Sequence, residues 1–60
     1  MKIIIMKKTQ AAIDNGIDKK STFGLLLDDN GFYTILPLGR KTSGVYSKAF
    51  WTVYKEVEVN

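Results

Sequence analysis

An Asn-Gly pair lies between two apolar runs in the segment FGLLLDDNGFYTILPL, residues 23–38. Asn and Gly tolerate the positive φ angles that a two-residue type I′ turn requires, so this pair predicts a β-hairpin. A two-residue loop pairs Leu25 with Leu36 and Leu27 with Thr34, and such partners share a face of the sheet. Because both faces then carry apolar side chains, we expect a small sheet that is strongly curved or closed.

A second Asn-Gly pair, at residues 15–16, leaves two structures open. It can form the turn of another hairpin, in the segment IDNGID. The segment TQAAIDNG also has the pattern of a short helix, in which Thr9 is the N-cap and the Asn-Gly pair ends the helix. The local sequence does not distinguish between these two structures.

The segment VYSKAFWTVYKEVEV, residues 45–59, alternates and is rich in β-branched and aromatic residues. This pattern predicts a strand. The segment is longer than most strands, so we also expect a bend or a bulge within it. Apolar residues from Phe50 to Val57 recur at helical spacing as well, and a helix over residues 47–57 is the alternative.

Together these segments predict a mainly β protein. We expect a small antiparallel meander of four to five strands or an SH3-like or OB-like barrel, with room for one short helix near residues 9–15. Sixty residues are enough for a single small domain, residues 1–60. The chain has no cysteine and no histidine, so neither a disulfide nor the usual zinc site reinforces the fold.

The charge and the hydropathy pattern limit the setting of the protein. Nine Lys or Arg and six Asp or Glu give a mildly basic net charge of +3. The opening MKIIIMKK has an apolar run too short for a secretory signal, and no segment has the length of a membrane span. We therefore expect a complete cytoplasmic protein that does not contact membranes.

Catalytic and metal-binding patterns are missing from the sequence. Without histidine or cysteine there is no base near neutral pKa beside a nucleophile, so we predict that the protein is not an enzyme. Counted from Asp14 or from Asp28, the twelfth position of a calcium loop holds no glutamate. We therefore predict no metal and no cofactor.

The loop PLGRKTSGVY, residues 37–46, has Gly39 and Gly44 around two adjacent cations, Arg40 and Lys41. A Walker A phosphate-binding loop has the same glycine spacing but requires Lys and Ser or Thr directly after the second glycine. Here a valine follows it, and the next segment has the pattern of a strand rather than a helix. The segment is therefore predicted to be a cationic connection between two strands.

Cations and aromatic side chains recur beside this loop. On an exposed sheet, such a combination stacks nucleic-acid bases and attracts phosphates. We predict that the loop from Gly39 to Gly44 and the sheet face beside it bind nucleic acid, through Arg40, Lys41, Tyr46, Lys48, Phe50 and Tyr54. In the alternative interpretation, the aromatic rings fill the core of a small barrel.

Protein binding is the second functional hypothesis. Small chains without catalytic residues are common as regulators or inhibitors in phages and mobile elements, where they bind a larger host protein. Docking would use strand addition or an aromatic hot spot of Phe50, Trp51 and Tyr54. A homodimer is a further expectation if the apolar N-terminal strand KIII lies at a sheet edge.

The segment DNGFYTILPLGRKTSGVYSKAFWT, residues 29–52, places Asn30-Gly31-Phe32 in a hairpin and Phe50-Trp51-Thr52 before the next element. In this it resembles the three-stranded sheet of the arm-type DNA-binding domains of tyrosine integrases. The resemblance implies a sheet that inserts into the DNA major groove. The following VYKEVEVN is β-like where that family has a helix, so we assign no family from it.

Overall fold

The computed structural model describes residues 1–60 as one antiparallel sheet of five strands with two short helical segments. The strands are β1 (Lys2–Lys8), β2 (Phe23–Asp29), β3 (Tyr33–Pro37), β4 (Gly44–Tyr46) and β5 (Trp51–Glu58). The helical segments are α1 (Gln10–Asp14) and the 3-10 turn η1 (Lys48–Phe50). No helix has the length and apolar character needed to cross a membrane. The prediction of a mainly β, antiparallel fold with one short helix is confirmed.

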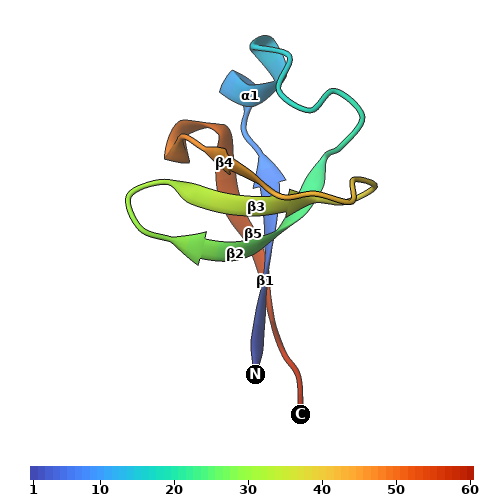
Figure 1. The fold of residues 1–60 in the computed structure, drawn as a ribbon, viewed down its shortest axis with the longest axis vertical. Helices are drawn as coiled ribbons and strands as arrows, with labels where there is room; N and C mark the ends of the chain where they lie inside the picture. Colours follow the sequence, from blue (N-terminus) through green and yellow to red (C-terminus); the bar gives the residue numbers. More distant parts are fainter.

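Strands β1 to β4 form a meander, and β5 returns to lie beside β1, which gives the order β4-β3-β2-β1-β5 (Figure 1). β2 pairs with β1 only at residues 5–7, so the first half of β1 is joined to β5 alone. These two strands project as a ribbon that ends in both chain termini (Figure 1). Residues 2–4 of β1 therefore have an unpaired backbone edge on the side away from β5, and the homodimer through this strand stays a prediction.

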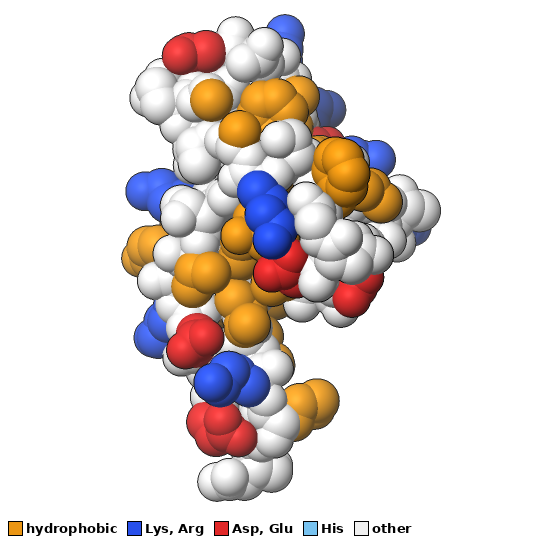
Figure 2. Space-filling view, turned by 90° about the vertical axis from the view of Figure 1, so that its left-hand side faces the viewer, with side chains coloured by type: hydrophobic (Ala, Val, Ile, Leu, Met, Phe, Trp, Pro, Cys, Tyr) orange, Lys and Arg blue, Asp and Glu red, His pale blue; other side chains and the backbone are white.

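The projecting ribbon carries alternating charges, which are visible at the lower end of the molecule in Figure 2. Lys2 pairs with Glu56 at 3.9 Å, and the terminal amino group of Met1 pairs with Glu58 at 3.2 Å. Hydrophobic side chains also reach the surface above this ribbon (Figure 2). The ion pairs are exposed, so each contributes little to stability.

The sheet curls on itself but does not close into a barrel. Tyr46 on β4 and Trp51 on β5 come from the two edge strands, yet their rings pack edge to face with centroids 5.5 Å apart. No backbone ladder joins β4 to β5, because β4 has only three residues and η1 follows it. The curl gives the sheet an inner face, which holds these two rings, and an outer face.

The core lies on the inner face. Met6, Ile35 and Trp51 are buried there, and Trp51 is 1% exposed. The half-buried side chains around them are Ile4, Leu26, Tyr33, Tyr46 and Phe50. Gly24 lies on the same face, where a Cβ atom would come within 2.6 Å of Ile35 Cγ2. The close approach of β2 and β3 therefore requires glycine at this position.

The β2–β3 hairpin matches the predicted register away from the turn and departs from it near the turn. Leu25 pairs with Leu36 as predicted. The loop is one residue longer than predicted, so the partners nearest the turn are Asp29 and Tyr33, and a bulge at Leu27 restores the register. In the Asn-Gly pair only the glycine has a positive φ, whereas a type I′ turn requires it at both positions.

The first Asn-Gly pair ends a helix and does not form a hairpin. The side chain of Thr9 caps α1 by accepting a hydrogen bond from the Ala12 amide at 3.3 Å. Asn15 is the C-cap, and Gly16 follows it with φ +66°, a conformation that glycine adopts without a Cβ clash. Of the two structures that the sequence left open, the helix is correct.

The 3-10 turn η1 divides the alternating segment into β4 and β5, and Ser47 caps the turn through its side chain. The expected bend is confirmed, whereas a helix over residues 47–57 is wrong because β5 pairs with β1 along its length. A bulge at Tyr54 then shifts the alternation, so that Val57 faces outwards. The resemblance to integrase arm domains also ends at this strand, where that family has a helix.

Candidate functional site

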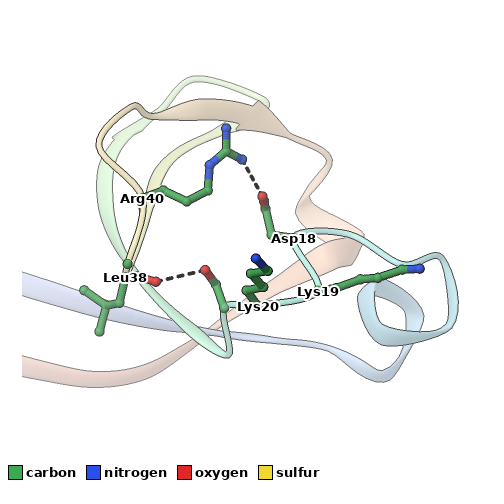
Figure 3. Close-up of a pocket in the computed structure, with 7 residues that line it drawn as sticks. Asp18, Lys19, Lys20, Leu38 and Arg40 are labelled. Carbon is green, nitrogen blue, oxygen red and sulfur yellow. Dashed lines mark hydrogen bonds and ion pairs between the residues drawn. The ribbon is translucent and has the colours of Figure 1, made fainter.

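Two loops that are distant in sequence enclose a pocket of about 230 Å³ at one side of the sheet (Figure 3). One loop follows α1, and the other follows β3. The residues that line the pocket are Asp18, Lys19, Lys20, Ser21, Leu38, Gly39 and Arg40. The pocket therefore includes part of the cationic loop that the sequence singled out.

Hydrogen bonds between side chains and the backbone hold the two loops together. The Ser21 hydroxyl donates to the Leu38 carbonyl at 2.9 Å, and the Arg40 guanidinium donates to the Asp18 carboxylate (Figure 3). Within each loop, the Ser21 amide donates to the Asp18 carbonyl and the Arg40 amide donates to the Pro37 carbonyl. The walls of the pocket are thus fixed to each other at two points.

Asp18 is the centre of this arrangement. One carboxylate oxygen accepts a hydrogen bond from Arg40 and the other accepts one from the Tyr46 hydroxyl, and the side chain is 10% exposed. Asp18 is also the only residue other than glycine with a positive φ, +43°, which aspartate tolerates better than most residues. The residue therefore joins the loop after α1 to both the β3–β4 loop and β4.

Lys8 holds the loop after α1 from the inner face of the sheet. Its side chain is buried on the inner face, and Nζ donates to the carbonyls of Ile17 at 3.0 Å and of Asp18 at 2.8 Å. The ammonium group has no carboxylate partner within ion-pair distance, so backbone oxygens satisfy it. Lys8 and Asp18 together anchor residues 17–18.

The hydrogen bonds shift the pKa values of the groups that make them. Partial burial raises the pKa of Asp18, but hydrogen bonds from Tyr46 and Arg40 outweigh it, and the pKa lies below the ordinary value of 3.8. Burial, together with the hydrogen bond to Asp18, raises the pKa of Tyr46 to about 12. At neutral pH Asp18 is therefore an anion and Tyr46 keeps its proton.

The lining of the pocket has an excess of positive charge, with three cations and one acid. Figure 3 shows Lys20 between the two loops, while Lys19 extends away from the pocket. The Arg40 side chain is 48% exposed, and its hydrogen bond to Asp18 keeps its pKa raised. The structure has no group of three or more acidic side chains close enough to hold a metal ion. The chemistry of the pocket therefore favours an anion.

The structure brings only some of the predicted nucleic-acid-binding residues together. Arg40 and Tyr46 meet at Asp18, and Lys41 is exposed in the same loop. Lys48 lies elsewhere: its ammonium group pairs with Asp29 at 2.7 Å and sits 5.3 Å from the centroid of the Tyr33 ring. Lys48 lies in η1 and not on a strand face, because η1 interrupts the strand.

The predicted aromatic residues do not share a surface either. Phe50 packs against the core, and Trp51 is buried in it. Tyr54 lies on the outer face instead, 58% exposed, with its ring centroid 4.9 Å from that of Phe23 and 5.9 Å from Lys7 Nζ. The interpretation of aromatic rings as core therefore holds for Phe50 and Trp51, but not for Tyr54.

Sequence reasoning missed the three charged pocket residues of the loop after α1, Asp18, Lys19 and Lys20. The available signal was the excess of cations in the first twenty residues of the chain. The residues next to Lys20 in the sequence do not predict that it lines the same pocket as Arg40, because that placement depends on how the loop after α1 folds over the sheet.

No known protein family, curated protein or solved structure is significantly similar to the chain. Function is therefore inferred from the geometry of the chain itself.

Proposed function

We propose that this protein binds nucleic acid by contacting the phosphodiester backbone at the pocket. The observation that carries the proposal is the meeting of two distant loops, which brings Lys20 and Arg40 to opposite walls of one pocket. Arg and Lys are the side chains that neutralise backbone phosphates, and release of counterions then drives binding. Lys41, exposed just beyond the pocket, supplies a contact to a neighbouring phosphate.

The carboxylate of Asp18 does not prevent an anion from binding. Both of its oxygens already accept hydrogen bonds, one from Arg40 and one from Tyr46. A guanidinium has five N–H donors, so Arg40 keeps donors for a phosphate while Asp18 fixes its orientation. In this proposal Asp18 and Tyr46 position the arginine and do not contact nucleic acid.

The size of the pocket favours contact with the backbone over recognition of bases. About 230 Å³ is less than the roughly 300 to 1,000 Å³ typical of sites that enclose a whole small molecule. A phosphate with part of its sugar fits such a space. Since phosphate contacts position a protein without specifying sequence, we expect little sequence preference.

Docking to a larger host protein through Phe50, Trp51 and Tyr54 has less support. Trp51 is 1% exposed, so it cannot serve as a hot spot without unfolding part of the core. Tyr54 is on the opposite face of the sheet from Trp51. The three rings therefore offer no common surface to a partner.

Fluorescence polarisation with labelled single- and double-stranded oligonucleotides at low salt tests the proposal. We expect binding that weakens several-fold in Lys20→Gln and in Arg40→Gln, because each removes a phosphate contact. Lys55→Gln, which removes the same charge from β5, is the matched control and should bind nearly as the wild type does. Thermal melting of each variant separates lost binding from lost folding.

Two results would contradict the proposal. One is the absence of binding to either kind of oligonucleotide at low salt. The other is an equal loss in Lys20→Gln and Lys55→Gln, which would show that only the net charge of the chain matters and that the pocket has no special role.

A further inference from the structure

The two Asn-Gly pairs of the chain, at residues 15–16 and 30–31, have different surroundings in the structure. Asparagine before glycine is especially prone to spontaneous deamidation, because glycine has no Cβ atom to shield its amide nitrogen. The reaction uses two groups, the side-chain amide of the asparagine and the backbone amide of the glycine. The hydrogen bonds of these two groups therefore decide which pair reacts.

Both groups are occupied in the pair that ends α1. The Asn15 side chain donates from Nδ2 to the Ala11 carbonyl at 2.7 Å. The Gly16 amide donates to the Ile13 carbonyl at 3.1 Å. Before the pair can react, the nitrogen of Gly16 must lose its hydrogen bond and the side chain of Asn15 must leave the end of the helix. The helix therefore protects this pair.

The same two groups are free in the loop between β2 and β3. Asn30 and Gly31 are exposed, and no atom lies within 4 Å of the place where a Cβ atom of Gly31 would be. The Gly31 amide lies outside every strand and donates no hydrogen bond in the loop, and the Asn30 side chain makes none. The hydrogen bond inside the loop runs from the Asn30 amide to the Phe32 carbonyl at 3.2 Å, so it involves neither group. Both groups are therefore available for the reaction.

We propose that Asn30 is a site of spontaneous deamidation in the folded protein, and that Asn15 is protected. The nitrogen of Gly31 loses its proton and attacks the side-chain carbonyl carbon of Asn30, which forms a cyclic succinimide. The side-chain amide nitrogen leaves as ammonia and takes up a proton in place of the one that Gly31 lost. Water then opens the ring at either carbonyl and gives aspartate or isoaspartate. Water is the only co-reactant, and no electrons are transferred.

The fold accommodates both products. The φ angle of Asn30 is negative, so aspartate adopts the same backbone conformation without strain. Isoaspartate adds a methylene group to the backbone, and the open space around Gly31 leaves room for it. Each reaction adds one negative charge beside Asp28 and Asp29, in a chain whose net charge is +3. The loop lies at the end of the β2–β3 hairpin away from the β3–β4 loop, so the pocket keeps its cations (Figure 1).

Mass spectrometry of the full chain, incubated in the folded state at mildly alkaline pH, tests this inference. Each deamidation adds about 1 Da, and peptide mapping assigns the change to Asn15 or Asn30. We expect Asn30 to react about tenfold or more faster than Asn15, because only the pair at Asn15 must first break hydrogen bonds. In urea that unfolds the chain, both pairs lose their surroundings and should react at similar rates.

Three variants separate the two sites. Asn30→Gln should abolish the early mass change, because the longer glutamine side chain closes the corresponding ring far more slowly. Asn15→Gln is the matched control and should deamidate as fast as the wild type. Thr9→Ala removes the N-cap of α1, so it should speed the reaction of Asn15 several-fold and leave that of Asn30 unchanged. Circular dichroism shows whether the sheet of each variant remains folded.

Two results would overturn the inference. Equal rates at Asn15 and Asn30 in the folded wild type would show that the hydrogen bonds at the end of α1 give no protection. An Asn30 side chain that reacts in urea but stays intact in the folded chain would show that the loop keeps it away from the Gly31 nitrogen.

Discussion

The Tyr46 hydroxyl donates a hydrogen bond to the carboxylate of Asp18, which lies 28 residues earlier in the chain. Arg40 donates to the other oxygen of the same carboxylate. One side chain thus joins the loop after α1 to β4 and to the β3–β4 loop, and so holds both walls of the pocket. The positions of Lys20 and Arg40 in the proposed function depend on this link.

Asp18→Asn should destabilise the protein by about 1 to 3 kcal/mol. The substitution removes the charge from a nearly buried group that accepts two side-chain hydrogen bonds, and charge-assisted bonds are the stronger ones. Urea unfolding measures the change. Asp14→Asn is the matched control, because Asp14 is exposed and accepts only from Gln10 within its own helix. Equal effects of the two substitutions would contradict a structural role for Asp18.

The stabilising effect of Asp18 should depend on pH in a defined direction. Its pKa in the folded protein lies below 3.8, so the contribution is fully present above the unfolded pKa and disappears as pH falls through the folded value. Wild type should therefore exceed Asp18→Asn in stability by a constant amount above about pH 5 and by less at about pH 2.5. Urea midpoints over this range test the prediction, and a difference that does not change with pH would refute it.

Lys8→Met should destabilise the protein by about 1 to 2 kcal/mol. Methionine fits the inner face but leaves the carbonyl of Ile17 without a hydrogen-bond donor. Thermal or urea unfolding measures the change, with Lys55→Met as an exposed control of the same chemistry. A gain in stability would show that burying the ammonium group costs more than its hydrogen bonds to Ile17 and Asp18 contribute.

The parts of the fold that could be predicted from the sequence are those set by neighbouring residues. Thr9 caps a helix that ends at an Asn-Gly pair, and both features act within a few positions of each other. The pairing of Leu25 with Leu36 was predicted from a two-residue loop at Asn30-Gly31, whereas the loop has three residues. The bulge at Leu27 offsets the extra loop residue, so Leu25 still pairs with Leu36.

The candidate site could be predicted only in part, because it depends on contacts between distant residues. The loop with Arg40 stood out by its charge, but its partner loop has the composition of an ordinary solvated turn. The aromatic side chains of the C-terminal segment alternate, yet η1 and the bulge at Tyr54 decide which of them face inwards. No periodic pattern in the sequence marks η1 or the bulge, so the burial of Trp51 could not be predicted from the spacing of apolar residues.

The dependence of oligonucleotide affinity on salt is the measurement that tests the proposed function most directly. Each phosphate contact contributes about 0.7 to 0.9 to the slope of log affinity against log salt concentration. The double variant Lys20→Gln/Lys41→Gln removes two cations without disturbing Asp18, so its slope should be shallower than that of the wild type by about 1.5. Lys55→Gln should leave the slope unchanged. A slope that is the same in the double variant and the wild type would contradict the claim that these two loops contact the nucleic-acid backbone.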